Sequence, residues 1–443
     1  MTQTWESPVA QSAHTDIHRP SAADYALEDE LHQLLIRDLD VSVLQDDDRA
    51  KARERVEQAA RVLAAQRMPR LVGDVKEEVI SRVVDEVIGL GPLEPLLRDP
   101  NVSEIMVNSP EEVFYERNGI IHESQVVFRD EAHVLKVVDR IVAAIGRHVD
   151  EASPMVDARL QDGSRVNIII PPLAPRSATI TIRKFLGDRL TMHDLIGSGT
   201  LSNEMAQLLE ACVKSKLNMV ISGGTGTGKT TLLNALSAYI PSRERIVTIE
   251  DPMELKLQQR HVVPLEARPA SIEGRGEVSQ RDLFRNALRM RPDRIIVGEV
   301  RGSEAFDMMQ AMNTGHEGSL TTVHANSPRD ALGRIENMVL MAGYDLPMAA
   351  IREQMASALH VIVQIARLSD GTRRVVNVTE VAGMEGPLIT LQEIFVFRQR
   401  GITPEGEVLG DLEATGIRPQ FADHLHAYGI DLPETTFGIG RWG

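Results

Sequence analysis

The chain of 443 residues is longer than one ordinary domain, so we expect two or three domains, and an apolar content of 42% is enough for packed cores. Its net charge of −16 argues against nucleic acid as the main partner, because phosphate binding needs clustered lysine and arginine. The single cysteine, Cys212, excludes an internal disulfide, and no stretch approaches the roughly 20 apolar residues of a membrane span.

The N-terminal part of the chain is expected to be a polar tail followed by helices. Residues 1–22 lack periodicity and the apolar segment of a signal peptide, which predicts a disordered tail. Residues 23–92 have apolar side chains at helical spacing and predict a small helical bundle for oligomerisation or docking. In its clearest helix, valines recur at every fourth position: Val75, Val79, Val83 and Val87.

Residues 93–183 have a different pattern, with short strands around one amphipathic helix, which predicts an α+β domain. The expected strands lie at 104–107, 113–115, 166–170 and 178–182, and the expected helix lies at 134–145. Residues 184–200 contain three glycines and are predicted to be a linker.

Helices and strands alternate in residues 201–400, which predicts a parallel sheet with helices on both faces. Ligands of such sheets bind at the carboxyl ends of the strands. Glu250, Glu299 and His324 each close a predicted strand at this end. Residues 401–443 are a C-terminal extension without assigned structure. Within residues 201–400, the last three strands are expected to be antiparallel additions at the sheet edge, at 361–366, 374–378 and 394–398.

One loop has the most specific pattern in the chain: from Gly223 it reads Gly, four residues, Gly-Lys-Thr, between a predicted strand and a predicted helix. Glycines let the backbone wrap around a phosphate, and the loop N–H groups bind the anion, so a turn without a ligand is the weaker reading. Lys229 is expected to reach the β- and γ-phosphates of ATP, and the Thr230 hydroxyl to bind Mg²⁺. The predicted nucleotide-binding residues are Gly224, Thr225, Gly226, Thr227, Gly228, Lys229, Thr230 and Thr231.

Two carboxylates and a histidine complete the expected catalytic site. Glu299 follows an apolar run and is expected on the metal side with Thr230, although Gly298 stands where a standard second nucleotide motif has Asp. Glu250 offers a second carboxylate, and the sequence leaves open which glutamate polarises the attacking water. Either could instead cap a helix or form a surface ion pair. His324 is a candidate sensor of the γ-phosphate.

Three long motifs resemble those of the type II/IV secretion ATPases: residues 286–302, the histidine-containing box at 311–326, and the acidic box at 248–252. From about Asp24 onwards the chain is also similar to the CpaF/TadA branch, which drives tight-adherence (Flp) pili. The motifs that resemble this branch lie at 154–160 and 181–185.

The resemblance implies a RecA-like P-loop ATPase core of the α/β class, preceded by a PAS-like α+β domain. It implies a homohexameric ring at the cytoplasmic face of the inner membrane, held there through partners. ATP cycling would act on an inner-membrane platform protein to add or remove pilin subunits. Nucleotide would bind between the α+β domain and the core, where Arg159, Arg165 and Arg183 match family positions that face it.

Two other functions stay open at this point. RecA-like cores also serve nucleic-acid-translocating ATPases of conjugation systems, but the acidic charge and an aromatic content of 4% leave few groups for strand binding. DNA-stimulated hydrolysis would favour this alternative. A nucleotide-dependent scaffold without catalysis is the other alternative, which the two glutamates disfavour and which inertness toward ATP would indicate.

Overall fold

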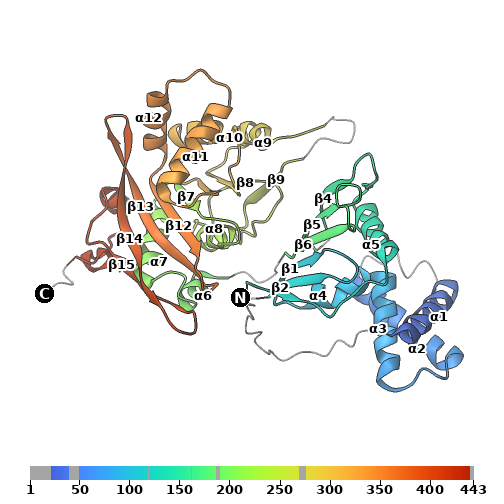
Figure 1. The fold of residues 1–443 in the computed structure, drawn as a ribbon. Coiled ribbons are helices and arrows are strands. Elements are labelled where there is room, and N and C mark those ends of the chain that lie inside the picture. Colours follow the sequence, from blue (N-terminus) through green and yellow to red (C-terminus); the bar gives the residue numbers. More distant parts are fainter. Residues whose placement is uncertain are drawn as a thin grey trace, which may run out of the picture. The chain divides into compact units, whose positions relative to one another are not determined.

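The computed structural model describes residues 21–38, 49–117, 119–160, 162–185, 190–268 and 276–439, and the chain divides into two compact units, residues 1–186 and 187–443 (Figure 1). The tail predicted at 1–22 falls almost wholly outside the described residues. Within these ranges, no helix is both long enough and apolar enough to cross a bilayer.

The first unit begins with three helices: α1 (Ala22–Asp38), α2 (Arg49–Arg67) and α3 (Gly73–Ile88). Their apolar side chains recur at helical spacing and form one buried cluster, which gives each short helix the tertiary packing that it needs for stability. The cluster includes Leu31 and Leu35 of α1, Val56 and Ala60 of α2, and Val79 and Val83 of α3.

An antiparallel sheet with the strand order β3-β2-β1-β6-β5-β4 follows in the same unit. Helix α5 (Glu131–Ala144) packs its apolar face on the core of this sheet. The predicted strands and helix are present, and β3 and β4 are additional. The remaining elements are η2 (Gly91–Leu93), α4 (Glu94–Arg98), β1 (Val102–Val107), β2 (Val113–Arg117), β3 (Ile120–Glu123), β4 (Met155–Arg159), β5 (Arg165–Ile169) and β6 (Thr179–Arg183).

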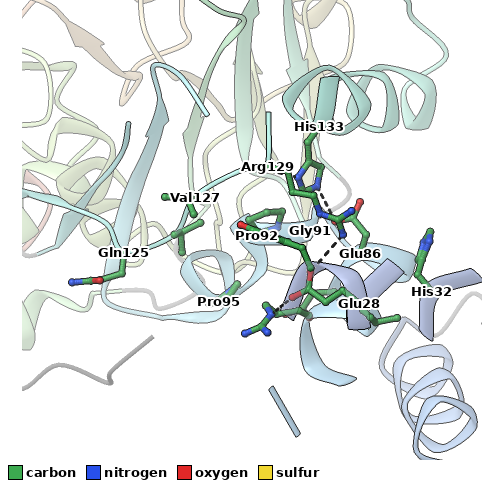
Figure 2. A pocket seen from close by; sticks show the side chains of 15 residues that line it. Glu28, His32, Glu86, Gly91, Pro92, Pro95, Gln125, Val127, Arg129 and His133 are labelled. Carbon is green, nitrogen blue, oxygen red and sulfur yellow. Dashed lines mark hydrogen bonds and ion pairs between the residues drawn. The ribbon is translucent and has the colours of Figure 1, made fainter. Parts of the chain in front are cut away.

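Charged side chains line a pocket of about 90 Å³ between α1, α3 and the residues around α5 (Figure 2). Glu28 of α1 is buried and contacts the guanidinium groups of Arg82 and Arg129, the latter at 3.5 Å. Glu86 of α3 bonds His133 of α5 at 3.0 Å. We call these five residues the ionic seam; it ties the helical bundle to the α+β part of the same unit.

The ionic seam predicts a stability that falls in acid. Burial alone would raise the pKa of Glu86, but the hydrogen bond and charge of His133 and the charge of Arg140 lower it from 4.5 to about 2. A folded pKa below the unfolded value means that ionised Glu86 stabilises the fold above pH 4.5, and that this contribution is lost as the pH falls toward 2. We expect Glu86→Gln to lower the unfolding temperature at pH 7, and the difference from wild type to shrink across this window.

Thermal unfolding followed by circular dichroism at several pH values measures this effect. Glu77→Gln is the matched control, because Glu77 lies on the same helix with its side chain 53% exposed. A difference between Glu86→Gln and wild type that does not change between pH 7 and pH 3 would contradict the assignment.

A nine-stranded sheet organises the second unit, in the order β15-β14-β13-β12-β7-β11-β10-β8-β9. The strands from β12 to β9 in this order are parallel, as predicted for the core. They are β12 (Val361–Arg367), β7 (Met219–Ser222), β11 (Leu320–Val323), β10 (Arg294–Val297), β8 (Ile246–Glu250) and β9 (Val262–Glu266).

The prediction that the strand at 361–366 is an antiparallel addition was wrong. This strand, β12, pairs parallel with β7, because helices lie between β11 and β12 and such a crossover lets the next strand run in the same direction. The next two predicted strands are antiparallel, and Figure 1 shows them as long, twisted strands. They are β13 (Arg373–Glu385) and β14 (Leu388–Ile402); β15 (Val408–Ala414), α13 (Ala422–Ala427) and η3 (Glu434–Phe437) follow in the extension.

Helices cover both faces of this sheet. Met219 and Ile221 of β7 pack into one apolar cluster and Val220 into the other, as alternation along a doubly covered strand requires. The first face is covered by α6 (Met192–Gly197), α7 (Asn203–Lys214), α8 (Lys229–Ser237) and α13. The second is covered by α9 (Gln280–Ala287), α10 (Glu304–Asn313), α11 (Pro328–Met341) and α12 (Met348–Ala358). Helix α6 lies inside the segment that was expected to be a linker.

Candidate nucleotide site

The register of the parallel strands brings their carboxyl ends to one edge of the sheet. Ser222 of β7 lies opposite Val323 of β11, and Val297 of β10 lies opposite Thr321 of β11 and Ile249 of β8. The residues that follow these positions are therefore neighbours at one edge, although about 100 residues of chain separate the first from the last. They are the predicted loop from Gly223, Glu250, Glu299 and His324.

The predicted phosphate loop connects β7 to α8. Gly228 has a φ of 97° and precedes the first residue of α8, so a larger residue would be strained at this turn. Lys229 Nζ donates hydrogen bonds to the carbonyl oxygens of Gly223 and Gly224, at 3.0 and 2.8 Å. The structure thus gathers all the predicted nucleotide-binding residues, Gly224 to Thr231, in this loop and the first turn of α8.

A carboxylate that the sequence reasoning missed lies beside the loop. Thr230 Oγ1 donates to Glu254 Oε2 at 3.4 Å, and the side chain of Glu254 is half-buried. The signal was present in the sequence, since Glu254 is the second glutamate in the run Glu250-Asp251-Pro252-Met253-Glu254. Glu254 was not predicted because it belongs to the loop after β8, whereas the prediction considered residues at the ends of strands.

Glu250 itself is buried, with 2% of its surface exposed. Its Oε1 accepts the backbone N–H groups of Glu254 and Leu255, both at 2.8 Å, and burial raises its pKa to about 7. A Cβ at Gly298 would lie 3.0 Å from Glu250 Cγ, so a larger residue at this position would have to push the Glu250 side chain aside. Glu250 therefore shapes the loop that carries Glu254.

Glu299 and His324 lie at the ends of the next two strands, surrounded by charge. Arg301 donates to Glu299 Oε2, with its Nε at 2.8 Å. Burial lowers the pKa of His324, and the positive charges of Lys229 and Arg334 lower it further while Glu299 opposes them. At neutral pH the imidazole is neutral, and it can donate one hydrogen bond to an anion near Lys229.

The three predicted arginines occupy neighbouring strand positions in the first unit. Arg159 lies directly opposite Arg165 on β4 and β5, and Arg165 lies directly opposite Arg183 on β5 and β6, so the three form one row across the sheet. We call them the arginine row. Arg165 pairs with Asp157 at 3.1 Å, and Arg159 lies over the ring of Phe185 at 5.8 Å. Like charges placed directly opposite each other normally destabilise a sheet.

Comparison with known proteins places the chain in a family. Residues 86–402 match the protein family described as "Type II/IV secretion system protein". The chain is 37% identical over 350 residues to a putative conjugal transfer protein of Mycobacterium tuberculosis, covering 77% of this chain and 98% of that protein. It is 35% identical over 328 residues to the type IV secretion system protein PtlH of Bordetella pertussis, covering 67% and 96%.

Among solved structures, the chain is similar to the VirB11 ATPase from the Brucella suis type IV secretion system. The identity is 32%, over 65% of this chain and 95% of that chain, with a TM-score of 0.35. A second similar structure is the pilus retraction motor PilT with bound ADP, at 22% identity and a TM-score of 0.49, over 65% and 81%.

Proposed function

The protein belongs to the type II/IV secretion system ATPase family, and from this premise we propose that it is the motor of a tight-adherence (Flp) pilus. In this proposal it works as a homohexamer at the cytoplasmic face of the inner membrane and acts on a platform protein. One observation supports ATP as the substrate. The residues that would bind and hydrolyse it lie near the same edge of the sheet: Lys229, Thr230, Glu254, Glu299 and His324. The motifs at 154–160 and 181–185 support the pilus assignment.

Each residue at this edge has a proposed task in hydrolysis. Lys229 and the loop N–H groups at the N-terminus of α8 bind the phosphates. The hydroxyl of Thr230 and the carboxylates of Glu254 and Glu299 are hard oxygen donors, which suits Mg²⁺. The metal would supply charge neutralisation at the phosphates. Because Glu254 reaches Thr230 whereas Glu250 is bound to backbone N–H groups, we assign the reacting carboxylates to Glu254 and Glu299.

The arginine row is proposed to bind the negative charge of the nucleotide when the first unit meets it. Asp157 lies 3.1 Å from Arg165 and Glu104 lies 3.9 Å from Arg183, so carboxylates partly offset the row, and its guanidinium groups still offer several N–H donors to an anion. We expect Arg183→Ala to lower the turnover number at least about tenfold with a smaller change in ATP affinity, since an arginine that stabilises transition-state charge acts on turnover.

Steady-state kinetics and equilibrium ATP binding separate these two effects. Arg176→Ala is the matched control, because Arg176 is an exposed arginine on the loop before β6. Normal turnover by purified Arg183→Ala would remove the arginine row from the proposed mechanism.

The oligomeric state tests the motor assignment. Glu299→Gln protein should retain ATP, hydrolyse it poorly, and reach the mass of a hexamer in light scattering with Mg·ATP. A monomer in every nucleotide state, at micromolar protein, would contradict a ring that forms by itself. In the native host, Lys229→Ala should remove surface pili; pili that persist at the wild-type level would contradict the pilus assignment.

A conjugation-type ATPase is the second candidate, because a relative at 37% identity is described as a putative conjugal transfer protein. The net charge of −16 opposes direct binding to a nucleic acid backbone. Turnover measured with and without single- and double-stranded DNA distinguishes the two. Stimulation by DNA at physiological salt would favour the conjugation-type motor.

A further inference from the structure

The phosphate loop lies against the hairpin formed by β12 and β13. A Cβ at Gly223 would collide with the backbone oxygen of Ile365 in β12. A Cβ at Gly228 would lie 3.7 Å from Ile365 Cδ1 and 3.5 Å from Arg373 Cδ in β13. The hairpin therefore contacts both ends of the loop, and its sequence is more than 130 residues away from the loop.

One polar contact joins the hairpin to the middle of the loop. Arg373 Nε donates a hydrogen bond to the carbonyl oxygen of Gly226 at 2.9 Å. In a trans peptide the C=O and the following N–H point in opposite directions. Fixing the Gly226 carbonyl toward Arg373 thus turns the N–H of Thr227 to the side of the loop away from Arg373. Loops that bind phosphate depend on such an alignment of successive N–H groups.

The turn that carries Arg373 is itself anchored. Asp370 Oδ1 accepts the backbone N–H and the hydroxyl of Thr372, at 2.9 and 2.6 Å. The other oxygen of Asp370 accepts the N–H of Val408 in β15 at 2.9 Å. A guanidinium held on a supported turn loses less conformational entropy when it bonds the loop than one on a free end would.

We propose that Arg373 is a positioning residue of the phosphate loop. Its guanidinium keeps the peptide between Gly226 and Thr227 in the orientation that binds the phosphates of ATP. It acts through the loop and so affects nucleotide affinity more than the chemical step. This inference rests on the assignment of residues 223–231 as the phosphate loop.

Purified Arg373→Ala should raise the KM and the Kd for ATP roughly tenfold, about 1.4 kcal/mol, with a turnover number within about twofold of wild type. The size follows from the loss of one charge-assisted hydrogen bond. Arg373→Lys should recover part of the affinity, because an ammonium group can donate to the same carbonyl. Arg374→Ala is the matched control, since the neighbouring Arg374 lies over the ring of Phe397, 5.2 Å from its centroid.

Unchanged affinity in Arg373→Ala would overturn the inference, as would a loss of turnover at constant KM or an Arg373→Lys variant no better than alanine. Lys229→Ala separates this result from the site assignment. Lost affinity in Lys229→Ala but not in Arg373→Ala would overturn the positioning role alone. Wild-type affinity in Lys229→Ala would overturn the phosphate-loop assignment and the inference together.

Discussion

Replacing Glu254 by glutamine should lower the ATPase turnover number by about 100-fold or more, whereas glutamine at Glu250 should leave most of the activity. Glu254 Oε2 lies 3.4 Å from the hydroxyl of Thr230, the group proposed to bind the metal. Glu250 instead accepts two backbone N–H groups through one oxygen. A glutamine side chain has an oxygen that can accept the same two bonds. Phosphate release at saturating ATP measures both variants.

The burial of Glu250 has a test that does not depend on activity. Burial raises the pKa of Glu250 from 4.5 to about 7, so the folded state holds its proton more tightly than the unfolded state. Its contribution to stability is present below pH 4.5 and is lost as the pH rises through 7. Glu250→Gln should therefore gain stability relative to wild type as the pH rises from 4.5 to about 7. In the assay of phosphate release, inactive Glu250→Gln together with active Glu254→Gln would instead assign the catalytic role to Glu250 and the structural role to Glu254.

Replacing Arg294 by methionine should destabilise the second unit by about 3–5 kcal/mol, the largest stability effect that we expect. Arg294 at the start of β10 is fully buried, donates to Glu244 at 2.5 Å and to the Gly318 carbonyl at 3.2 Å. Removing it leaves the buried carboxylate of Glu244 without this cation. Urea unfolding followed by circular dichroism measures the loss.

The double variant Arg294→Met with Glu244→Gln is the control. It should recover much of the stability, because no buried charge of the pair is then left. If the loss in free energy of unfolding in the double variant equals the sum of the losses in the two single variants, Arg294 and Glu244 are not coupled. ATP affinity measured well below the unfolding temperature should stay near wild type, since Arg294 lies at the end of β10 opposite to Glu299.

The sequence by itself determined the features that depend on contiguous residues. The predicted phosphate loop is a local strand-loop-helix pattern, and the structure has this loop between β7 and α8. The alternation of helices and strands predicted a parallel sheet, and the strand ends at Glu299 and His324 followed from that pattern. The motifs at 248–252, 286–302 and 311–326 predicted an ATPase of the type II/IV secretion family, which the family match over residues 86–402 confirms.

Only the tertiary structure decided the features that depend on burial and on register between distant segments. Local patterns cannot tell that Glu250 is desolvated against Gly298 while Glu254 reaches Thr230, because packing of separate strands sets both environments. The parallel pairing of β12 and the arginine row come from strand register, which the whole sheet fixes. The bond from Arg373 to Gly226 joins residues 147 positions apart, so no local propensity encodes it.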